Sequence, residues 1–426
     1  MLRLTDGVWE NWSKSTRVRP RSVHFPETEA ELRTVVERAD GTLRVVGAGH
    51  SFPPVAASEA TLVSLERYTG LVDVDVDEKR VTVRAGTPLS ELTTALSEHG
   101  LMLENMGDID AQSVAGALAT GTHGTGTDFG VLSTQTTGMR LVTAEGDVID
   151  LEADDELFGH AQVSLGALGV VSQVTLDVVS EYRLREHKFP ASVDDVLDSL
   201  DEYREHRNFE FWWFPHTETA LVKTLDETDD CGEVSRLDPV EERLENLAWE
   251  GLCRVGTRVR PASSPLNRLA VSTFSDTTRV APARDVYPTT RDVRFNETEY
   301  GVPRENAVDV FAELRAVVEA AGVMFPVEFR DVAADSIPLS PATGRESTFI
   351  AVHAYHRRPY ERLVRDAESV FDRFEGRPHW GKHHTKTADD LASLYPDWNA
   401  FQTARERFDP DGLFVNPHLE RVFEGD

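Results

Sequence analysis

Residues 46–52 read Val-Gly-Ala-Gly-His-Ser-Phe, and they follow directly on an apolar run that begins at Leu43. The run predicts a short strand that ends in a glycine-rich turn. Because glycine has no Cβ, the backbone N–H groups of such a turn can approach an anion closely. The pattern therefore indicates a turn that binds the phosphates of a cofactor.

Two common phosphate-binding motifs do not fit this turn. A P-loop would end in Gly-Lys-Ser or Gly-Lys-Thr, which is absent here. A dinucleotide-binding Rossmann turn needs a third glycine where Phe52 stands, and Pro53 and Pro54 prevent the helix that should follow. Glu66 does have the spacing of a ribose-binding acid. The interpretation we favour is a pyrophosphate-binding turn in which His50 faces the cofactor.

A second glycine-rich segment covers residues 105–126 and reads Asn-Met-Gly-Asp-Ile-Asp-Ala-Gln-Ser-Val-Ala-Gly-Ala-Leu-Ala-Thr-Gly-Thr-His-Gly-Thr-Gly. Its five glycines, small residues and hydroxyls let the backbone wrap closely around a large ligand. Structural turns would explain one or two of these glycines, but not all of them. We interpret the segment as a ligand cradle, although spacing alone does not name the ligand.

The charge of the chain limits its partners. The 426 residues carry 74 acidic and 44 basic side chains, a net charge of −30, and only six of the basic residues are lysines. Nucleic acids and anionic membranes need a basic surface, so neither is an expected partner. Acidic, lysine-poor chains resemble proteins of halophiles that accumulate salt. We expect folding to improve between about 0.1 M and about 1 M KCl, where the Debye length falls from about 10 Å to about 3 Å.

The sequence predicts a cytoplasmic protein that does not insert into a membrane. No run approaches the roughly 18 apolar residues that a membrane span needs, and the first residues lack the pattern of a secretory signal. Cys231 and Cys253 do not form a disulfide framework.

Periodicity predicts an α+β fold. Residues 18–182 alternate short strands with helices, and Thr28 and Glu31 have the spacing of a capping box. The strands expected there are 43–46, 62–65, 80–85, 136–143, 148–151 and 170–182, and the helices are 28–39 and 88–99. From 184 to 375 we expect helices at 192–206, 238–254, 304–320 and 359–373, and strands at 209–214, 221–225, 294–301, 324–330 and 348–355. Such a mixture is typical of an antiparallel sheet covered by helices.

Three segments in this order resemble the FAD-linked oxidases of the vanillyl-alcohol oxidase superfamily, within it the sugar-1,4-lactone oxidase and alditol oxidase branch. They are the turn at 47–51, the cradle at 107–126 and His379-Trp380-Gly381-Lys382. The resemblance covers nearly the whole chain. It implies a two-part FAD-binding domain of the PCMH type (1–183), a cap domain for the substrate (184–375) and a C-terminal segment (376–426) that packs back on the FAD-binding domain.

The resemblance also implies which residues hold FAD, and that His50 is bonded covalently to the flavin. The expected cofactor-binding residues are Gly47, Ala48, Gly49, His50, Ser51, Gly107, Asp108, Gln112, Ser113, Gly116, Thr120, Gly121, Thr122, His123, Gly124, Val170 and His379.

On the substrate side, Glu328 and Arg330 lie two residues apart on a predicted strand and therefore share a face. A salt bridge inside the cap would explain the same pair. In the resembling family a Glu-x-Arg at this place contacts the substrate, and His353 and Lys382 match substrate-facing residues. We therefore expect Lys382, Arg330, His353 and Glu328 to be catalytic.

Ser113 and Glu297 are the expected substrate-binding residues. Ser113 matches a serine beside the substrate and the flavin. Glu297 departs from the family, because alditol oxidases carry glutamine there. A carboxylate only accepts hydrogen bonds, so this difference opens the substrate to lactones, aldoses or other sugar alcohols.

The expected function is FAD-dependent oxidation of a small polyol, sugar or sugar lactone, by hydride transfer to flavin N5 with O₂ as acceptor. One alternative is a dehydrogenase that uses an electron carrier, and another is a flavin-binding subunit without turnover. His379, His383, His384 and His418 suggest a metal, but they lack a metalloprotease pattern and cysteine ligands, so we predict none.

Overall fold

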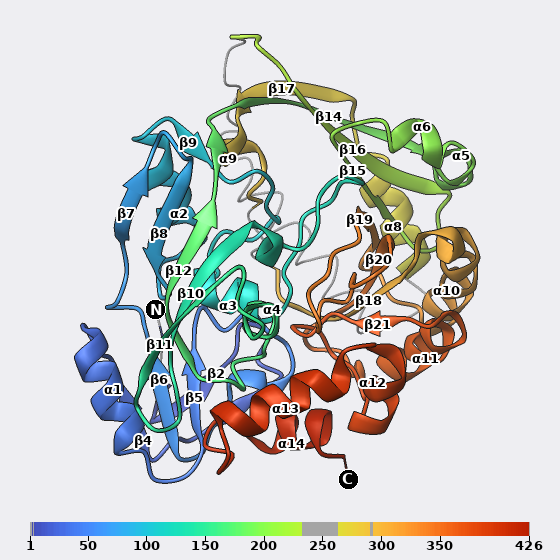
Figure 1. Ribbon diagram of the computed structural model, residues 1–426. Coiled ribbons are helices and arrows are strands. Elements are labelled where there is room, and N and C mark those ends of the chain that lie inside the picture. The colour runs from blue at the N-terminus through green and yellow to red at the C-terminus, as the bar shows by residue number, and fades with distance from the viewer. Residues whose placement is uncertain (1, 3, 232–262, 290–292, 426) are drawn as a thin grey trace.

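The computed structural model describes residues 2, 4–231, 263–289 and 293–425. Figure 1 shows an N-terminal part with several sheets, a second part built on one large sheet, and C-terminal helices beneath both in this view. The mixed α and β architecture expected from the sequence is confirmed. The boundaries at 183 and 375 remain predictions.

The first sheet is parallel, with strand order β4-β6-β5. Its strands are β4 (Ser22–His24), β5 (Leu43–Val46) and β6 (Thr61–Ser64). Helix α1 (Glu29–Glu37) lies between β4 and β5 in the chain, as parallel strands require a crossover. Thr28 caps this helix by accepting from the N–H of Glu31, as predicted. The Glu31 carboxylate, however, accepts from the N–H of Glu27, so the expected capping box closes one residue earlier.

The second sheet is antiparallel, with strand order β11-β10-β12-β8-β7. Its strands are β7 (Leu71–Asp75), β8 (Arg80–Arg84), β10 (Thr136–Val142), β11 (Val148–Glu152) and β12 (Val170–Asp177). Helices α2 (Leu89–Ser97), α3 (Val114–Ala119) and α4 (Phe158–Gln162) lie in the same part. The hairpin predicted from residues 136–151 is confirmed.

The single strand expected at 170–182 is wrong. Strand β12 ends at Asp177, opposite Arg80 at the start of β8, and the N–H of Val178 then donates to the carbonyl of Lys79. Beyond this point none of the described strands of this sheet pairs with the chain. The chain instead forms β13 (Val179–Ser180), which pairs with β9 (Leu101–Met102).

The large sheet is antiparallel, with strand order β17-β14-β16-β15-β19-β20-β18-β21. Its strands are β14 (Arg183–Ser192), β15 (Asn208–Trp213), β16 (Thr219–Glu227), β17 (Thr277–Pro282), β18 (Phe295–Pro303), β19 (Val327–Val332), β20 (Ser347–Tyr355) and β21 (Arg377–Pro378). The five strands predicted between 209 and 355 are all present.

Two expectations in this part need correction. The helix expected at 192–206 is two short helices, α5 (Val193–Asp198) and α6 (Leu200–Tyr203), which meet at Ser199. Strand β14 was not expected, because its sequence is rich in charge and contains Pro190. Pairing with β16 on one side and β17 on the other holds it in the sheet. The helix predicted at 238–254 lies outside the described residues.

The two faces of the large sheet differ in character. Phe211 and Trp213 of β15, Phe329 of β19 and Ile350 of β20 pack in one apolar core with helices of this part, including α10 (Ala307–Ala321) and α11 (Glu361–Phe371). Successive side chains of a strand point to opposite faces. The neighbours of these apolar residues therefore face away from the helices, and among them are the charged side chains of Glu210, Glu328 and Arg330.

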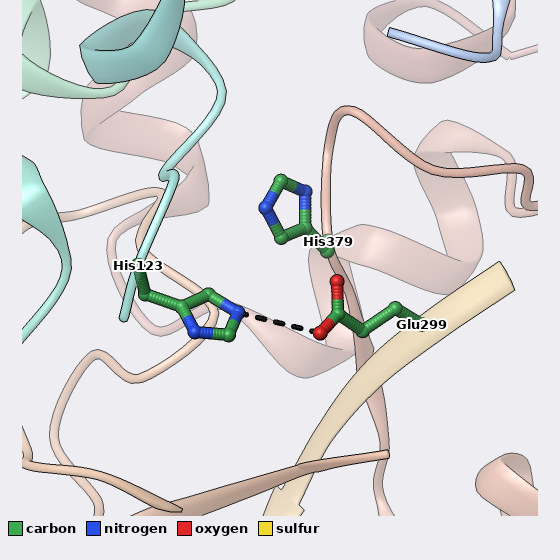
Figure 2. Close-up of side chains that lie close together, drawn as sticks. All are labelled: His123, Glu299 and His379. Atoms are coloured by element: carbon green, nitrogen blue, oxygen red, sulfur yellow. Dashed lines mark ion pairs between the residues drawn. The ribbon is translucent and has the colours of Figure 1, made fainter. Parts of the chain in front are cut away.

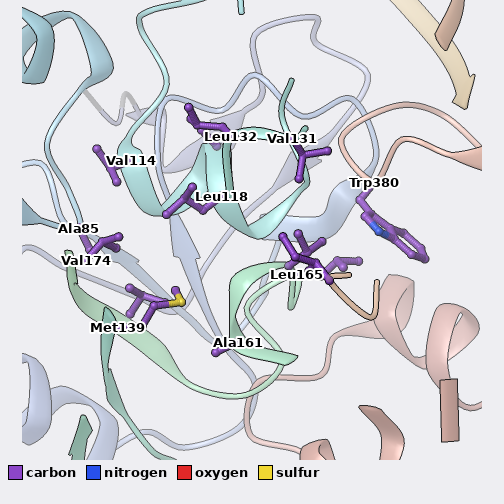
Figure 3. Close-up of a cluster of buried hydrophobic side chains, with 14 of the residues drawn as sticks. Ala85, Val114, Leu118, Val131, Leu132, Met139, Ala161, Leu165, Val174 and Trp380 are labelled. Atoms are coloured by element: carbon purple, nitrogen blue, oxygen red, sulfur yellow. The ribbon is translucent and has the colours of Figure 1, made fainter. Parts of the chain in front are cut away.

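The C-terminal segment shares a core with the N-terminal part. Helices α12 (Ala388–Leu394), α13 (Trp398–Phe408) and α14 (Pro417–Phe423) contribute to the cluster that includes Leu32 and Leu165. Figure 3 shows Trp380 beside Leu165 in this cluster. The buried guanidinium of Arg44 donates to the carbonyls of Val55, Leu165, Gly166 and Phe414, and so joins four chain segments.

The remaining elements are short. They are β1 (Leu4–Thr5), β2 (Val8–Glu10), β3 (Arg17–Val18), α8 (Ser263–Val271), α9 (Ala283–Val286) and the 3₁₀ turns Pro54–Ala56, Leu132–Gln135, Arg304–Asn306 and Asp372–Phe374. Within the described ranges, no helix has the length and apolar character needed to cross a bilayer.

Candidate active site

The site is built on the face of the large sheet that points away from α10 and α11. Strand register places carboxylates directly across from basic side chains or an imidazole on this face. Lys223 of β16 stands opposite Glu210 of β15, and Glu210 stands opposite Arg330 of β19. On β18 and β20, Glu297 stands opposite His353. The alternation that buries the apolar core therefore also lines up polar side chains on the opposite face. We call this set the polar row; its members are Lys223, Glu210, Glu328, Arg330, Glu297 and His353.

Arg330 is held by three carboxylates. Its guanidinium lies 2.6 Å from Glu328, 2.7 Å from Glu210 and 2.8 Å from Asp108. Lys223 completes the group, with its Nζ 2.8 Å from Glu210 and 3.7 Å from Asp108. The predicted sharing of one face by Glu328 and Arg330 is thus observed, and the two side chains also form the alternative salt bridge.

Asp108 comes from the glycine-rich cradle, whereas the other members come from the sheet. We predicted from the sequence that Asp108 binds the cofactor. In the structure its carboxylate accepts a hydrogen bond from Arg330 of the predicted cap. This contact brings the two parts of the chain together at the site.

Lys382 joins two further carboxylates. Its Nζ lies 2.6 Å from Oε2 of Glu297 and 3.6 Å from Oε2 of Glu299. His353 approaches the other oxygen of Glu297 at 3.5 Å, and His123 approaches the other oxygen of Glu299 at 3.5 Å. Figure 2 shows His123, from the cradle, pointing at Glu299, with His379 beside them.

Both glutamates are ionised at neutral pH. Burial alone would raise the pKa of Glu297, but the Lys382 ammonium and the His353 imidazole outweigh burial and lower it to about 2. The same balance, through Lys382 and His123, lowers the pKa of the buried Glu299 well below its usual value.

The glycine-rich turn lies against both the cradle and the Lys382 segment. A Cβ on Gly47 would come within 2.5 Å of the Ser113 hydroxyl, so the turn and the cradle touch where only glycine fits. The N–H of Phe52 donates to the carbonyl of Gly381, and the Phe52 ring lies under the Lys382 ammonium at 5.3 Å. Gly49 has a φ of +71°, the left-handed conformation that glycine adopts at little cost.

His50 fits an attachment point for a cofactor. Its side chain is half-buried and stacks on Trp12 with ring centroids 5.8 Å apart, yet its buried Nδ1 atom has no hydrogen-bond partner among the described residues. A buried polar atom without a partner is unfavourable unless a ligand satisfies it. Burial, reinforced by the charge of Lys382, lowers the pKa of His50 to about 4, so the imidazole is neutral at neutral pH.

The cradle itself folds tightly. A Cβ on Gly107 would meet the carbonyl of His123 at 2.7 Å, and one on Gly124 would meet the carbonyl of Met106 at 2.5 Å. The two ends of the cradle therefore lie side by side. Gln112 donates to the hydroxyl of Thr122.

The other predicted cofactor-binding residues cap a helix, lie in the glycine-rich segments or pack in the core. The Ser113 hydroxyl caps α3 by accepting from Gly116, and the Thr120 hydroxyl donates to the carbonyl of Gly116. Ala48, Ser51 and Gly121 lie in the two glycine-rich segments, whereas Val170 is buried in the core opposite Val142. His379 is buried 5.5 Å from the His123 ring, and its Nδ1 accepts from the N–H of Gly381.

Sequence reasoning missed Glu299, Glu210 and Lys223. Glu210 and Lys223 interrupt the apolar runs Phe209–Trp213 and Leu221–Leu225, and Lys223 is one of only six lysines. These signals were available. What the sequence lacked was the register that places the two side chains opposite one another.

Within the part of the chain that the structure describes, three groups of buried side chains lie close enough together to hold a metal ion: His123, Glu299 and His379; Glu297, Glu328 and His353; and Asp108, Glu210 and Glu328. Lys382, Arg330 or Lys223 already binds carboxylates in each group. These cations balance charge that would otherwise attract a metal, and the absence of a metal stays a prediction.

Comparisons with known proteins agree with this geometry. Residues 174–422 match the D-arabinono-1,4-lactone oxidase family, and residues 20–152 match an FAD binding domain. The chain is 39% identical to L-gulono-1,4-lactone dehydrogenase of Mycobacterium tuberculosis over 97% of this chain and 99% of that one. It is 31% identical to L-gulonolactone oxidase of Mus musculus (97% and 98%) and 29% identical to alditol oxidase of a Streptomyces species (97% and 99%). Its fold matches a solvent-stable cholesterol oxidase with a TM-score of 0.82 and 18% identity, over 97% of each chain.

Lys223→Met should lower the free energy of unfolding by about 3–5 kcal/mol, because it leaves the carboxylates of Glu210 and Asp108 short of a buried partner. Lys188→Met is the matched control. Lys188 stands opposite Lys223, but its side chain is 29% exposed and its partner Glu186 keeps Arg279. The control should lose less than about 1 kcal/mol. Equal losses in denaturant unfolding would show that the buried pairs do not hold this face together.

Proposed function

Since the chain belongs to the D-arabinono-1,4-lactone oxidase family and carries an FAD-binding domain, we propose that it oxidises a CH–OH group of a sugar lactone, sugar or small polyol. The observation that carries the proposal is the polar row of the large sheet. It offers hydrogen-bonding groups for several hydroxyls beside the two glycine-rich segments that would hold FAD.

The charged groups in and around the polar row favour a neutral substrate. Five carboxylates (Asp108, Glu210, Glu297, Glu299 and Glu328) face three cations (Lys223, Arg330 and Lys382). A further carboxylate would have to enter a buried site with excess negative charge, which is costly. A lactone or a polyol carries no charge, and its hydroxyl groups can donate hydrogen bonds to the carboxylates. We therefore expect the site to prefer a 1,4-lactone over the aldonate that forms when the lactone ring opens.

The residues divide the chemistry as follows. When bound, FAD supplies the two-electron acceptor for the hydride that leaves the substrate carbon. The substrate hydroxyl loses its proton to His353, whose buried Nε2 lies 3.5 Å from Glu297 and has no hydrogen-bond partner among the described residues. Lys382 and Arg330 stabilise the negative charge that develops on the substrate oxygen, and their carboxylate partners hold both cations in place before substrate arrives. Glu328, Glu297 and Ser113 bind the remaining hydroxyls.

Two candidate acceptors for the reoxidation of the flavin are O₂ and an electron carrier. The sequence led us to expect O₂, and relatives named L-gulonolactone oxidase support that expectation. The higher identity to a protein named L-gulono-1,4-lactone dehydrogenase favours an electron carrier. Measuring hydrogen peroxide against dye reduction with the same substrate distinguishes the two.

An anaerobic substrate panel tests the function. Sugar-1,4-lactones, aldoses and alditols are mixed with the purified holoenzyme while the flavin absorbance is followed. We expect at least one neutral substrate to bleach the flavin, and the ring-opened aldonate of the best lactone to fail. If no neutral sugar derivative reduces the flavin, the chain is a flavin-binding subunit rather than an enzyme of this class.

We also propose that FAD is bonded covalently to His50, since the Nδ1 atom of this neutral imidazole has no hydrogen-bond partner among the described residues and would be available for such a bond. After acid precipitation the wild-type chain should stay yellow and gain the mass of one FAD, whereas His50→Ala should release its flavin. His160→Ala is the control, because His160 Nδ1 is also buried, likewise has no hydrogen-bond partner in the described ranges, and lies outside both glycine-rich segments. A colourless wild-type pellet would exclude the bond.

Lys382→Met should lower kcat and kcat/KM together by about 10²–10³, because the ammonium acts on charge that appears only in the transition state. Lys386→Met changes the same residue type four positions later, where the lysine pairs with Asp372, and should keep the wild-type rate. Both variants should retain FAD, which is checked by absorbance. A rise in KM alone would assign Lys382 to substrate binding only.

A further inference from the structure

A loop near the start of the chain is bound to the end of the glycine-rich turn. Residues 11–16, which we call the N-terminal loop, connect β2 to β3. The side-chain amide of Asn11 donates to the carbonyl of Phe52 at 3.1 Å. The hydroxyls of Ser15 and Thr16 donate to the same carbonyl, at 2.8 and 3.2 Å. Three side chains of one loop therefore converge on a single backbone oxygen and hold the loop against the turn.

Trp12, in the same loop, covers the imidazole of His50. The backbone N–H of Trp12 donates to the carbonyl of Gly49 at 2.8 Å, and its indole stacks on the imidazole with an angle of 20° between the ring planes. Two further rings hold the indole through edge contacts. They are Phe52, with ring centroids 6.4 Å apart, and Phe295 of β18, with centroids 5.2 Å apart. The indole is thus fixed from the turn and from the large sheet.

The His50 ring needs such a contact to keep one orientation. Its Nδ1 atom has no hydrogen-bond partner among the described residues, so no polar contact at this atom sets the direction in which it points. The terminal torsion of a histidine side chain has broad energy wells, which leaves the ring plane loosely defined by itself. A reacting atom must be held in place, because a misplacement of about 1 Å can slow a reaction about 10²-fold. Stacking on a fixed indole meets this requirement.

We propose that Trp12 is a positioning residue for the attachment of FAD, which holds the His50 imidazole in the orientation from which Nδ1 bonds to the C8 methyl carbon of the flavin. The assignment rests on the covalent bond proposed above. Trp12 acts through His50, and the hydrogen bonds of the N-terminal loop to the turn keep the two rings together.

The attachment step needs no base from the protein. The lone pair of Nδ1 forms the new N–C bond, and one C–H bond of the methyl group breaks. The two electrons of that C–H bond reduce the flavin ring system, and the protons from the methyl group and the imidazole end on the reduced ring. O₂ or the electron carrier then removes two electrons and two protons, and the flavin is oxidised again. Trp12 therefore changes the rate of the step and not its products.

The test follows attachment in the full-length chain, made by cell-free synthesis without FAD. FAD is then added in air. Bound FAD is measured after gel filtration, and attached flavin is measured as the fluorescence that stays with the acid-denatured chain. Trp12→Leu removes the stacked ring and should attach its bound FAD about 10²-fold more slowly than the wild type. Trp12→Phe keeps a smaller ring on His50 and should be slower by only a few-fold.

Trp9→Leu is the matched control for lost packing in the same hairpin. Trp9 lies in β2, and its ring is buried in an apolar cluster with Val18 and Leu62. Per bound FAD, this variant should attach flavin at the wild-type rate. Equal slowing in Trp9→Leu and Trp12→Leu would overturn the proposal, and so would attachment by Trp12→Leu at the wild-type rate. If Trp12→Leu does not fold or does not bind FAD, Trp12→Phe decides, and a wild-type rate in that variant would overturn the proposal.

The two proposals on the flavin fail in different ways. A wild-type chain without attached flavin would refute the covalent bond to His50 itself. A wild-type chain with attached flavin, together with an unchanged rate in the Trp12 variants, would refute the role of Trp12 and leave the bond standing. The anaerobic substrate panel reports on the oxidation and is independent of both.

Discussion

The pairing of charges across the buried face of the large sheet is the constraint on which the site depends. One face of the sheet is covered by α10 and α11 through apolar side chains, so strand alternation directs the intervening residues to the other face. That face is buried as well. Charged groups can remain there only if each meets an opposite charge at close range, because an unpaired buried charge costs several kcal/mol. The register that sets Lys223 opposite Glu210, and Glu210 opposite Arg330, meets this requirement.

The C-terminal segment supplies Lys382, the cation of the site that does not come from a strand of the large sheet. Lys382 follows β21 at the edge of the sheet, and its segment is fixed by Trp380, which packs in the core of the N-terminal part and donates to the carbonyl of Leu339. The hydrogen bond from Phe52 to Gly381 then sets the glycine-rich turn beside the same lysine. A single short segment thus contacts the substrate side, the cofactor side and the shared core, which explains why residues so distant in sequence meet.

Local signals in the sequence predicted much of this arrangement. The strands between 209 and 355 have clear apolar patterns, and the glycine-rich segments stand out by composition. Strand β14 and the break between β12 and β13 were not predictable in this way, because neighbouring strands determine them rather than their own residues. The same distinction holds in the site. Glu328 and Arg330 share a face by spacing alone, but the contact of Arg330 with Asp108, 222 residues away in sequence, needs the whole fold.

The bridge from Asp108 to Arg330 also bears on how freely the two parts can be separated. A cap excised from the chain would keep Glu210 and Glu328 around Arg330 but would lose the third carboxylate, and Glu299 would lose His123. Grafting this cap onto another flavoprotein scaffold would succeed only if the new scaffold offered an acid and an imidazole at the same two places. The substrate specificity of this chain is therefore not a portable module. Evolution or engineering must change the cradle and the cap together.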